Sequence, residues 1–153
     1  MSLVFNAISN TRSTYALRVY SENIGGTRLK SQQAAVSTTD CRNGLCTRTI
    51  LLDDLLPLMR GRRAVMKVDV EGHQPRVFTN STAAKFFQQI DVSLIFMEWA
   101  LCYQQNVRQE VLDLVRFFTE RQYQLFSHDY RPLGTNCRQW GDVIFTKMQA
   151  GEF

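Results

Sequence analysis

The stretch of residues 64–98 constrains the fold more than any other part of the chain. It begins with a mostly apolar run at residues 64–70, which is typical of a strand buried in a parallel sheet. Residues 74–89 follow as a predicted helix, interrupted near residues 80–82, and residues 92–97 predict a second strand. Alternating strands and helices of this kind predict a parallel sheet that is covered by helices.

The C-terminal segments extend the same pattern. Residues 108–121 carry apolar side chains at helical spacing, which predicts the best helix of the chain. Residues 123–127 and 142–146 predict two further strands. A parallel crossover needs a longer link than the one between these strands, so we expect the last strand to be antiparallel. The 153 residues suit a single α/β domain whose sheet is mostly parallel.

The first 59 residues yield shorter elements. In chain order we predict a strand, a second strand, a glycine-containing turn, a β-hairpin and a short helix, at residues 3–8, 15–20, 23–27, 34–50 and 51–59. Asp53 is a suitable N-cap for that helix. The segment of residues 1–10 lacks the charged and apolar pattern of a signal peptide.

Two of the four cysteines flank an Asn-Gly pair, the preferred centre of a tight hairpin turn. In such a hairpin Cys41 and Cys46 would face each other, so a disulfide is geometrically plausible, with two free thiols as the alternative. A zinc site is disfavoured because no second ligand pair has suitable spacing, and we predict no metal. Together with the glycosylation sequon at Asn80, the cysteine pair hints at a secretory-pathway lumen, and otherwise the cytoplasm is expected.

The charge pattern bears on possible partners. The net charge of +4 is mild, and the basic residues cluster clearly only at residues 60–63. We interpret this cluster as a solvated loop in preference to a phosphate-binding patch, so no nucleic-acid partner is expected. No apolar run reaches the roughly 18 residues that a membrane span needs.

Acidic residues follow both strands of the 64–98 stretch. Asp69 and Glu71 come after the first strand, and Glu98 comes after the second. Ligands of open α/β sheets bind beyond the carboxyl ends of the strands, where carboxylates can accept a proton or hold a cofactor ammonium. The alternative is that these carboxylates cap the helices that follow. Gly72 permits a tight turn, and His73 is more typical of a solvated loop residue than of a base.

These segments together resemble the FkbM family of methyltransferases. The resemblance rests on Leu-Asp-Asp-Leu-Leu at residues 52–56, Met-Lys-Val-Asp-Val-Glu-Gly-His at residues 66–73 and the strand ending in Glu98. The segment of residues 6–10, Asn-Ala-Ile-Ser-Asn, is also similar to the family's sequence after its third strand. The match is firmest between residues 49 and 99.

The resemblance implies a Rossmann-like methyltransferase sheet and transfer of a methyl group from S-adenosylmethionine, usually to oxygen. The acceptor would be a hydroxyl of a small molecule or a carbohydrate. The residues that the resemblance implicates fall in two sets. The catalytic set is Asp69, Glu71 and His73, and the cofactor-binding set is Asn6, Asp69, Gly72 and Glu98.

The chain departs from the family at its beginning. The family's first two strands, with the glycine-rich turn that cradles the cofactor, have no counterpart, so residues 1–153 are expected to form an N-terminally truncated domain. Residues 3–8 would then either pair directly with residues 64–70 or leave both strands with exposed edges that invite self-association. The alternative function is therefore a non-catalytic, methyltransferase-like remnant that binds a partner or dimerises.

Overall fold

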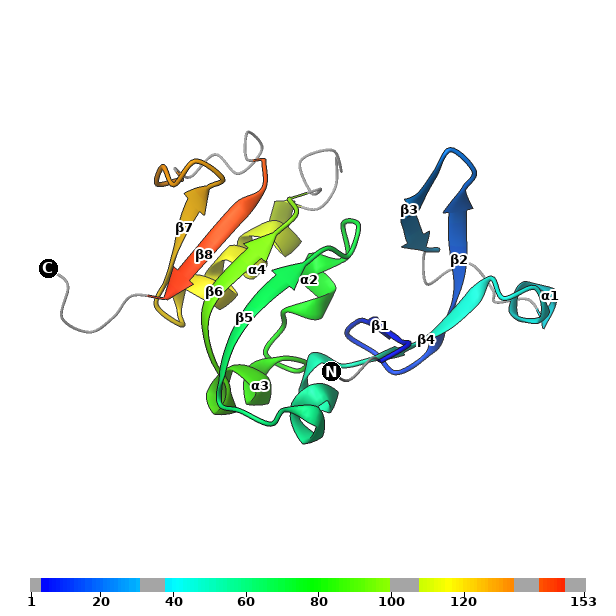
Figure 1. Ribbon diagram of the computed structural model, residues 1–153, viewed down its shortest axis with the longest axis horizontal. Helices are drawn as coiled ribbons and strands as arrows, with labels where there is room; N and C mark the ends of the chain where they lie inside the picture. Colours follow the sequence, from blue (N-terminus) through cyan, green and yellow to red (C-terminus); the bar gives the residue numbers. More distant parts are fainter. Residues whose placement is uncertain (1–3, 31–37, 100–107, 134–140, 148–153) are drawn as a thin grey trace, which may run out of the picture.

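Two four-stranded mixed sheets form the protein (Figure 1). This computed structural model describes residues 4–30, 38–99, 108–133 and 141–147. Strand pairing is mostly antiparallel, with one parallel pair in each sheet. The predicted fold class, a mostly parallel Rossmann-like α/β sheet, is therefore wrong.

The N-terminal sheet has the strand order β1-β4-β2-β3. Strand β2 pairs antiparallel with both β3 and β4, and β1 pairs parallel with β4. The elements of this half are β1 (Ala7–Ile8), β2 (Thr14–Tyr20), β3 (Asn23–Leu29), α1 (Thr38–Arg42) and β4 (Cys46–Ile50).

The C-terminal sheet has the order β5-β6-β8-β7, in which only β5 and β6 are parallel. The last strand, β8, runs antiparallel to both of its neighbours, as its short connection predicts. The elements are the 3-10 helix η1 (Leu52–Leu58), β5 (Arg63–Val68), α2 (Gln74–Val77), α3 (Ala84–Gln89), β6 (Asp91–Met97), α4 (Arg108–Thr119), β7 (Tyr123–Ser127) and β8 (Val143–Lys147).

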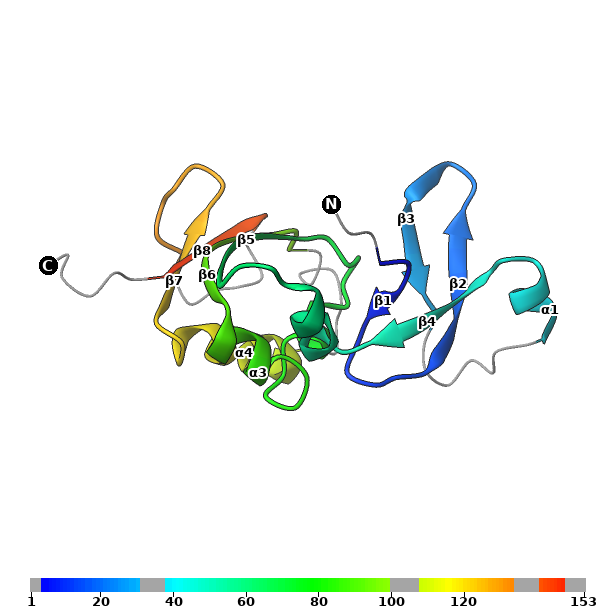
Figure 2. The same cartoon turned by 60° about the horizontal axis from the view of Figure 1, so that its bottom comes forward.

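The main core lies between the C-terminal sheet and helices α3 and α4, which cover one of its faces (Figure 2). Aromatic rings fill this layer, with Phe118 at its centre in contact with Phe78, Phe117, Tyr123 and Phe145. Val65 and Phe96 belong to the opposite face and are 63% and 39% exposed. That face carries no helix among the described residues, whereas the fold we predicted covers its sheet with helices.

Two predictions for the N-terminal half are wrong for local reasons. Residues 23–27 are strand rather than turn, because pairing with β2 outweighs the flexibility of the adjacent Gly25 and Gly26. The Asn-Gly pair ends a helix instead of turning a hairpin. The Asn43 amide donates to the Thr39 carbonyl, and Gly44 follows with φ +71°, a conformation that commonly terminates helices.

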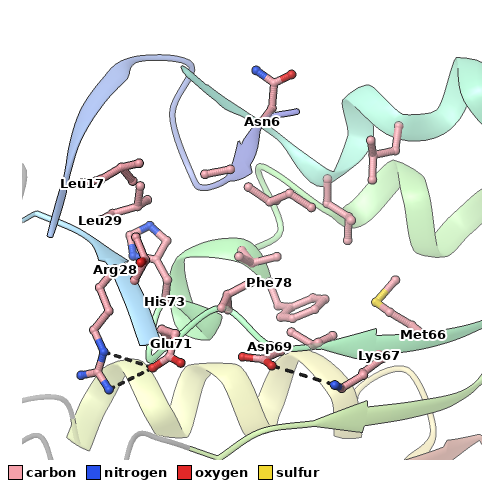
Figure 3. A pocket seen from close by; sticks show the side chains of 18 residues that line it. Asn6, Leu17, Arg28, Leu29, Met66, Lys67, Asp69, Glu71, His73 and Phe78 are labelled. Atoms are coloured by element: carbon pink, nitrogen blue, oxygen red, sulfur yellow. Dashed lines mark hydrogen bonds and ion pairs between the residues drawn. The ribbon is translucent and has the colours of Figure 1, made fainter. Parts of the chain in front are cut away.

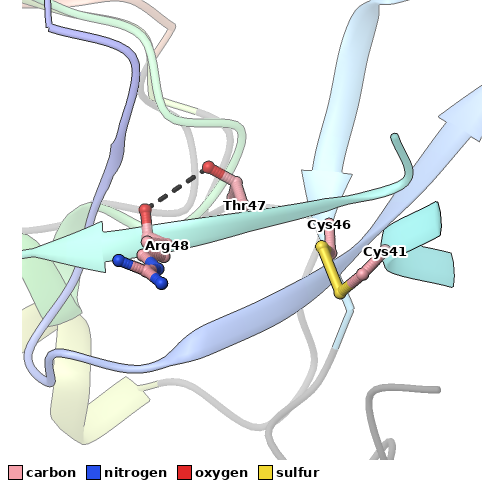
Figure 4. The surroundings of a disulfide bond; sticks show 4 residues. All are labelled: Cys41, Cys46, Thr47 and Arg48. Atoms are coloured by element: carbon pink, nitrogen blue, oxygen red, sulfur yellow. Dashed lines mark hydrogen bonds between the residues drawn. A yellow bond between two sulfur atoms is a disulfide. The ribbon is translucent and has the colours of Figure 1, made fainter. Parts of the chain in front are cut away.

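The cysteine pair nevertheless forms a disulfide, which joins Cys41 on α1 to Cys46 at the start of β4 (Figure 4). The two Cα atoms are 4.9 Å apart, within the ordinary range for a disulfide. The bond therefore ties the short helix to the strand that follows it.

The short helix after β4 is confirmed, but its N-cap is not Asp53. The carboxylate of Asp54 accepts the Leu51 amide at 3.0 Å, while Asp53 accepts the Phe86 amide at 2.8 Å. Asp53 thus anchors α3 to η1. The helix predicted at residues 74–89 is interrupted as expected, since α2 and α3 are separate.

Polar side-chain contacts and the Tyr15–His73 ring contact join the two halves. Arg12 pairs with Asp54 at 2.7 Å, Arg28 pairs with Glu71 at 2.9 Å, and Ser9 hydrogen-bonds His73. Strands β1 and β5 do not pair with each other. Each is the terminal strand of its own sheet, so both keep one edge unpaired among the described strands.

Candidate functional site

A cavity of ≈ 580 Å³ lies between the end of β5 and the N-terminal sheet (Figure 3). Its wall takes consecutive residues from β1, from β3 and from the segment 66–71. Apolar side chains such as Leu17, Leu29 and Phe78 alternate with the polar groups of Asn6 and His73. The cavity falls within the roughly 300–1,000 Å³ of ordinary small-molecule sites.

Three carboxylates converge at one end of this cavity, where Asp69 and Glu71 line the wall and Glu98 lies next to them outside the wall. One oxygen each from Asp69, Glu71 and Glu98 lies within 4.8 Å of the others. They meet because β5 and β6 are parallel and Val68 is in register with Met97, so both strands end at the same edge. All three carboxylates therefore lie at the carboxyl-terminal edge of this parallel strand pair. Oxygen donors so spaced also suit a hard divalent cation.

Glu98 is the most perturbed of these acids. Burial raises the pKa of its carboxyl, and the adjacent Asp69 carboxylate adds to the effect. Its Oε2 atom is buried and has no hydrogen-bond partner among the described residues. Glu98 therefore retains its proton to a higher pH than an ordinary glutamate does.

Glu71 and Gly72 form a tight turn directly after β5. Glu71 has φ 51° and Gly72 has φ 86°, and the His73 amide closes the turn on the Val70 carbonyl at 3.0 Å. Positive φ is rare for glutamate, and such strain is common at functional sites. Arg28 holds Glu71 in place, because its Nε and Nη2 atoms both donate to Oε2, at 3.1 and 2.9 Å.

His73 is partly buried on the cavity wall rather than solvated. Its Nε2 lies 2.9 Å from the hydroxyl of Ser9, which is fully buried at the end of β1. Burial, helped by the nearby Arg76 charge, lowers the pKa of His73 to about 4. The ring is therefore neutral at pH 7 and can accept a proton or a hydrogen bond.

The alternative that the acids cap the next helix is wrong for α2. His73 occupies the N-cap position, and no side chain makes a capping hydrogen bond there. For Glu98 the capping alternative concerns residues 100–107, which lie outside the described residues. Asn6 lines the cavity and donates to the Arg48 carbonyl at 3.3 Å, while Gly72 serves the turn and is not part of the cavity wall.

Sequence reasoning missed three residues that organise this site. Arg28 was hidden because the glycine pair within its strand predicted a turn, and Ser9 carried no signal of its own beyond its place after a short apolar run. Gln74 is fully buried, and its side-chain amide donates to the Glu98 carbonyl at 2.7 Å. A glutamine at the first turn of a predicted helix gives no hint of such a role.

No protein-family model, no curated protein and no solved structure matches this chain. Among the described residues, no helix is both long and apolar enough to span a membrane.

Proposed function

We propose that this chain binds S-adenosylmethionine at the acidic end of β5 and β6, in the service of methyl transfer to a hydroxyl of a small molecule or carbohydrate. The observation that carries the proposal is the convergence of Asp69, Glu71 and Glu98 within 4.8 Å. Only part of this charge is balanced, since Arg28 pairs with Glu71 and Lys67 lies 3.9 Å from Asp69. A cationic ligand would balance the rest.

The residues present suit the methionine end of such a cofactor. Its ammonium and sulfonium groups are positive, and the unpartnered Oε2 of Glu98 is an acceptor that an ammonium could satisfy. The apolar wall at Ile8, Leu17 and Leu29 suits an aromatic base. The resemblance of residues 66–73, Met-Lys-Val-Asp-Val-Glu-Gly-His, to the FkbM methyltransferases also supports this cofactor.

When bound, S-adenosylmethionine supplies an electrophilic methyl group. The chain's own contribution would be to orient the acceptor hydroxyl and to take its proton. His73 suits the first task because it is uncharged at neutral pH and Ser9 fixes its ring by a hydrogen bond at 2.9 Å, while its pKa of about 4 makes it a weak base. Asp69, which is half exposed and also lines the cavity, is the candidate base.

Calorimetry with two ligands tests the proposal, because S-adenosylhomocysteine lacks the positive sulfonium. We expect micromolar binding of S-adenosylmethionine and weaker binding of S-adenosylhomocysteine. Asp69→Asn should lower the affinity for S-adenosylmethionine about tenfold, as loss of one charge-assisted contact does. Asp113→Asn, which changes an exposed acid on α4, is the matched control. Absence of binding, or equal losses in both variants, would refute the cofactor site.

A second candidate, the binding or dimerisation module, is favoured by the outer edges of β1 and β5, which pair with no other described strand. Unpaired strand edges accept strands from other chains, and the uncovered face at Val65 and Phe96 adds apolar area. Sedimentation equilibrium over a hundredfold concentration range tests it. A monomer at all concentrations would remove self-association.

The compartment also belongs to this proposal. A disulfide between Cys41 and Cys46 is stable in oxidising compartments and rare in the cytosol. We therefore favour a secretory or otherwise oxidising location. Mass spectrometry of the natural protein under non-reducing conditions tests this, and free thiols at both positions would contradict it.

A further inference from the structure

A second groove, of ≈ 540 Å³, lies between β1, β4 and the 3-10 helix η1. It adjoins the first cavity, with which it shares Asn6, Ile8 and Leu55. Apart from Asn6 and Arg60 its wall is apolar, formed by Val4, Ile8, Ile50, Leu55, Leu58 and Met59. The carboxylates of the candidate site do not line it.

Apolar side chains are also exposed around this groove. Leu58 on its wall is 49% exposed, and Phe5, next to the lining residue Val4, is 84% exposed. Single exposed apolar residues are common, but several beside one apolar groove mark a binding surface. The groove therefore offers area to an apolar chain.

Two exposed arginines border the groove and the hollow that adjoins it. Arg60 belongs to its wall, and Arg62 lines an adjoining hollow that shares Met59 and Arg60 with it. Both are exposed, and neither forms an ion pair with a described carboxylate. Arg63, by contrast, lies near Asp91. The loop thus places two arginines beside an apolar groove, and neither is neutralised by a described carboxylate.

We propose that this groove binds a single-chain anionic amphiphile, with its chain along the apolar wall and its carboxylate or phosphate head at Arg60 and Arg62. Arginine suits both heads because its fork of donors matches their oxygens. The apolar wall supplies chain-length dependence, since each buried methylene strengthens binding roughly fourfold. This site does not depend on the proposed methyl transfer.

The test is calorimetry of the full chain with dodecanoate, below its micelle concentration, against dodecyltrimethylammonium and octanoate. We expect saturable binding of dodecanoate, much weaker binding of octanoate and none of the cation. The variant Arg60→Gln/Arg62→Gln should lower the affinity for dodecanoate about tenfold or more. Arg42→Gln, at an exposed arginine on α1, is the matched control and should bind as the unchanged chain does.

A second variant tests the apolar wall. Leu58→Asp introduces a negative charge at a half-exposed position, so the fold should tolerate it while dodecanoate binding is lost. Circular dichroism confirms the fold of each variant. The proposal is overturned by absence of saturable dodecanoate binding, by equal binding of the cationic amphiphile, or by an unchanged affinity in the arginine variant. Binding to anionic vesicles alone, without monomeric dodecanoate binding, would also overturn it and assign the arginines to a membrane surface.

Discussion

Protonation of His73 should weaken the folded state in mild acid. The ring is partly buried, hydrogen-bonded to Ser9 and close to the Arg76 charge, and its pKa is lowered from 6.5 to about 4. The unfolded chain therefore binds a proton on this residue at a higher pH than the folded chain does. The contribution of the neutral ring to stability is complete above pH 6.5 and is lost as the pH falls towards 4.

The magnitude follows from the size of the shift. The pKa falls from 6.5 to about 4. At 1.36 kcal/mol for each pH unit, this corresponds to about 3 kcal/mol. The ring retains some contact with solvent, so this figure is an upper bound. A loss of even 2 kcal/mol is a large share of the stability of a domain of this size.

The assay is chemical denaturation at pH 7.5 and pH 4.5, for the unchanged chain and for His73→Gln. The unchanged chain should lose about 2 kcal/mol more than the variant between these pH values, because the folded ring is still mostly neutral at pH 4.5. Acids with lowered pKa values, such as Asp54 and Asp91, contribute equally to both proteins and cancel in the comparison. The chain has only two histidines, so His128→Gln is the natural control.

Nuclear magnetic resonance gives an independent reading of the same quantity. The ring signals of His73 should titrate with a midpoint near 4, and Ser9→Ala should alter its ring-nitrogen shifts. A titration midpoint near 6.5 would refute the reasoning, because a buried His73 ring should not keep the pKa of a solvated one. Identical pH dependence in the unchanged chain and His73→Gln would refute it equally.

Two further predictions concern stability. Phe118→Ala should cost about 3 to 5 kcal/mol, because the ring is fully buried, whereas Phe96→Ala, on the exposed sheet face, should cost about 1 kcal/mol or less by urea denaturation. Replacing both Cys41 and Cys46 with serine should lower the free energy of unfolding by about 2 kcal/mol, the loop-closure value for so short a loop. An unchanged melting temperature in the serine variant would show that the bond does not constrain the unfolded chain.

The sequence was informative wherever local patterns decide the structure. The strand and helix order after residue 63 was predicted because each segment carries its own period of apolar side chains. The convergence of Asp69 and Glu98 was also predictable, since two strands joined by one crossover end at the same edge. The antiparallel β8 followed from its short connection alone.

Pairing partners, by contrast, were decided by tertiary contacts. Neither the glycine pair of β3 nor the Asn-Gly step after α1 reveals locally whether it belongs to a strand, a helix end or a turn. The strands form two separate mixed sheets because β1 pairs with β4, whereas β5 pairs with β6. Both pairings join strands that are far apart in the sequence. The prediction of a mostly parallel sheet was wrong because the parallel pairing of β5 and β6 does not extend to the other strands.

The chemistry of the site divides in the same way. Sequence alone marked Asp69, Glu71, His73 and Glu98 as candidate site residues, since they follow the strand ends. Only the tertiary structure decided their state. Burial and the nearby Arg76 charge keep His73 neutral, Arg28 from a distant strand holds Glu71, and desolvation raises the pKa of Glu98. The physical reason is that desolvation and charge pairing depend on neighbours in space, which a local pattern of residue types does not specify.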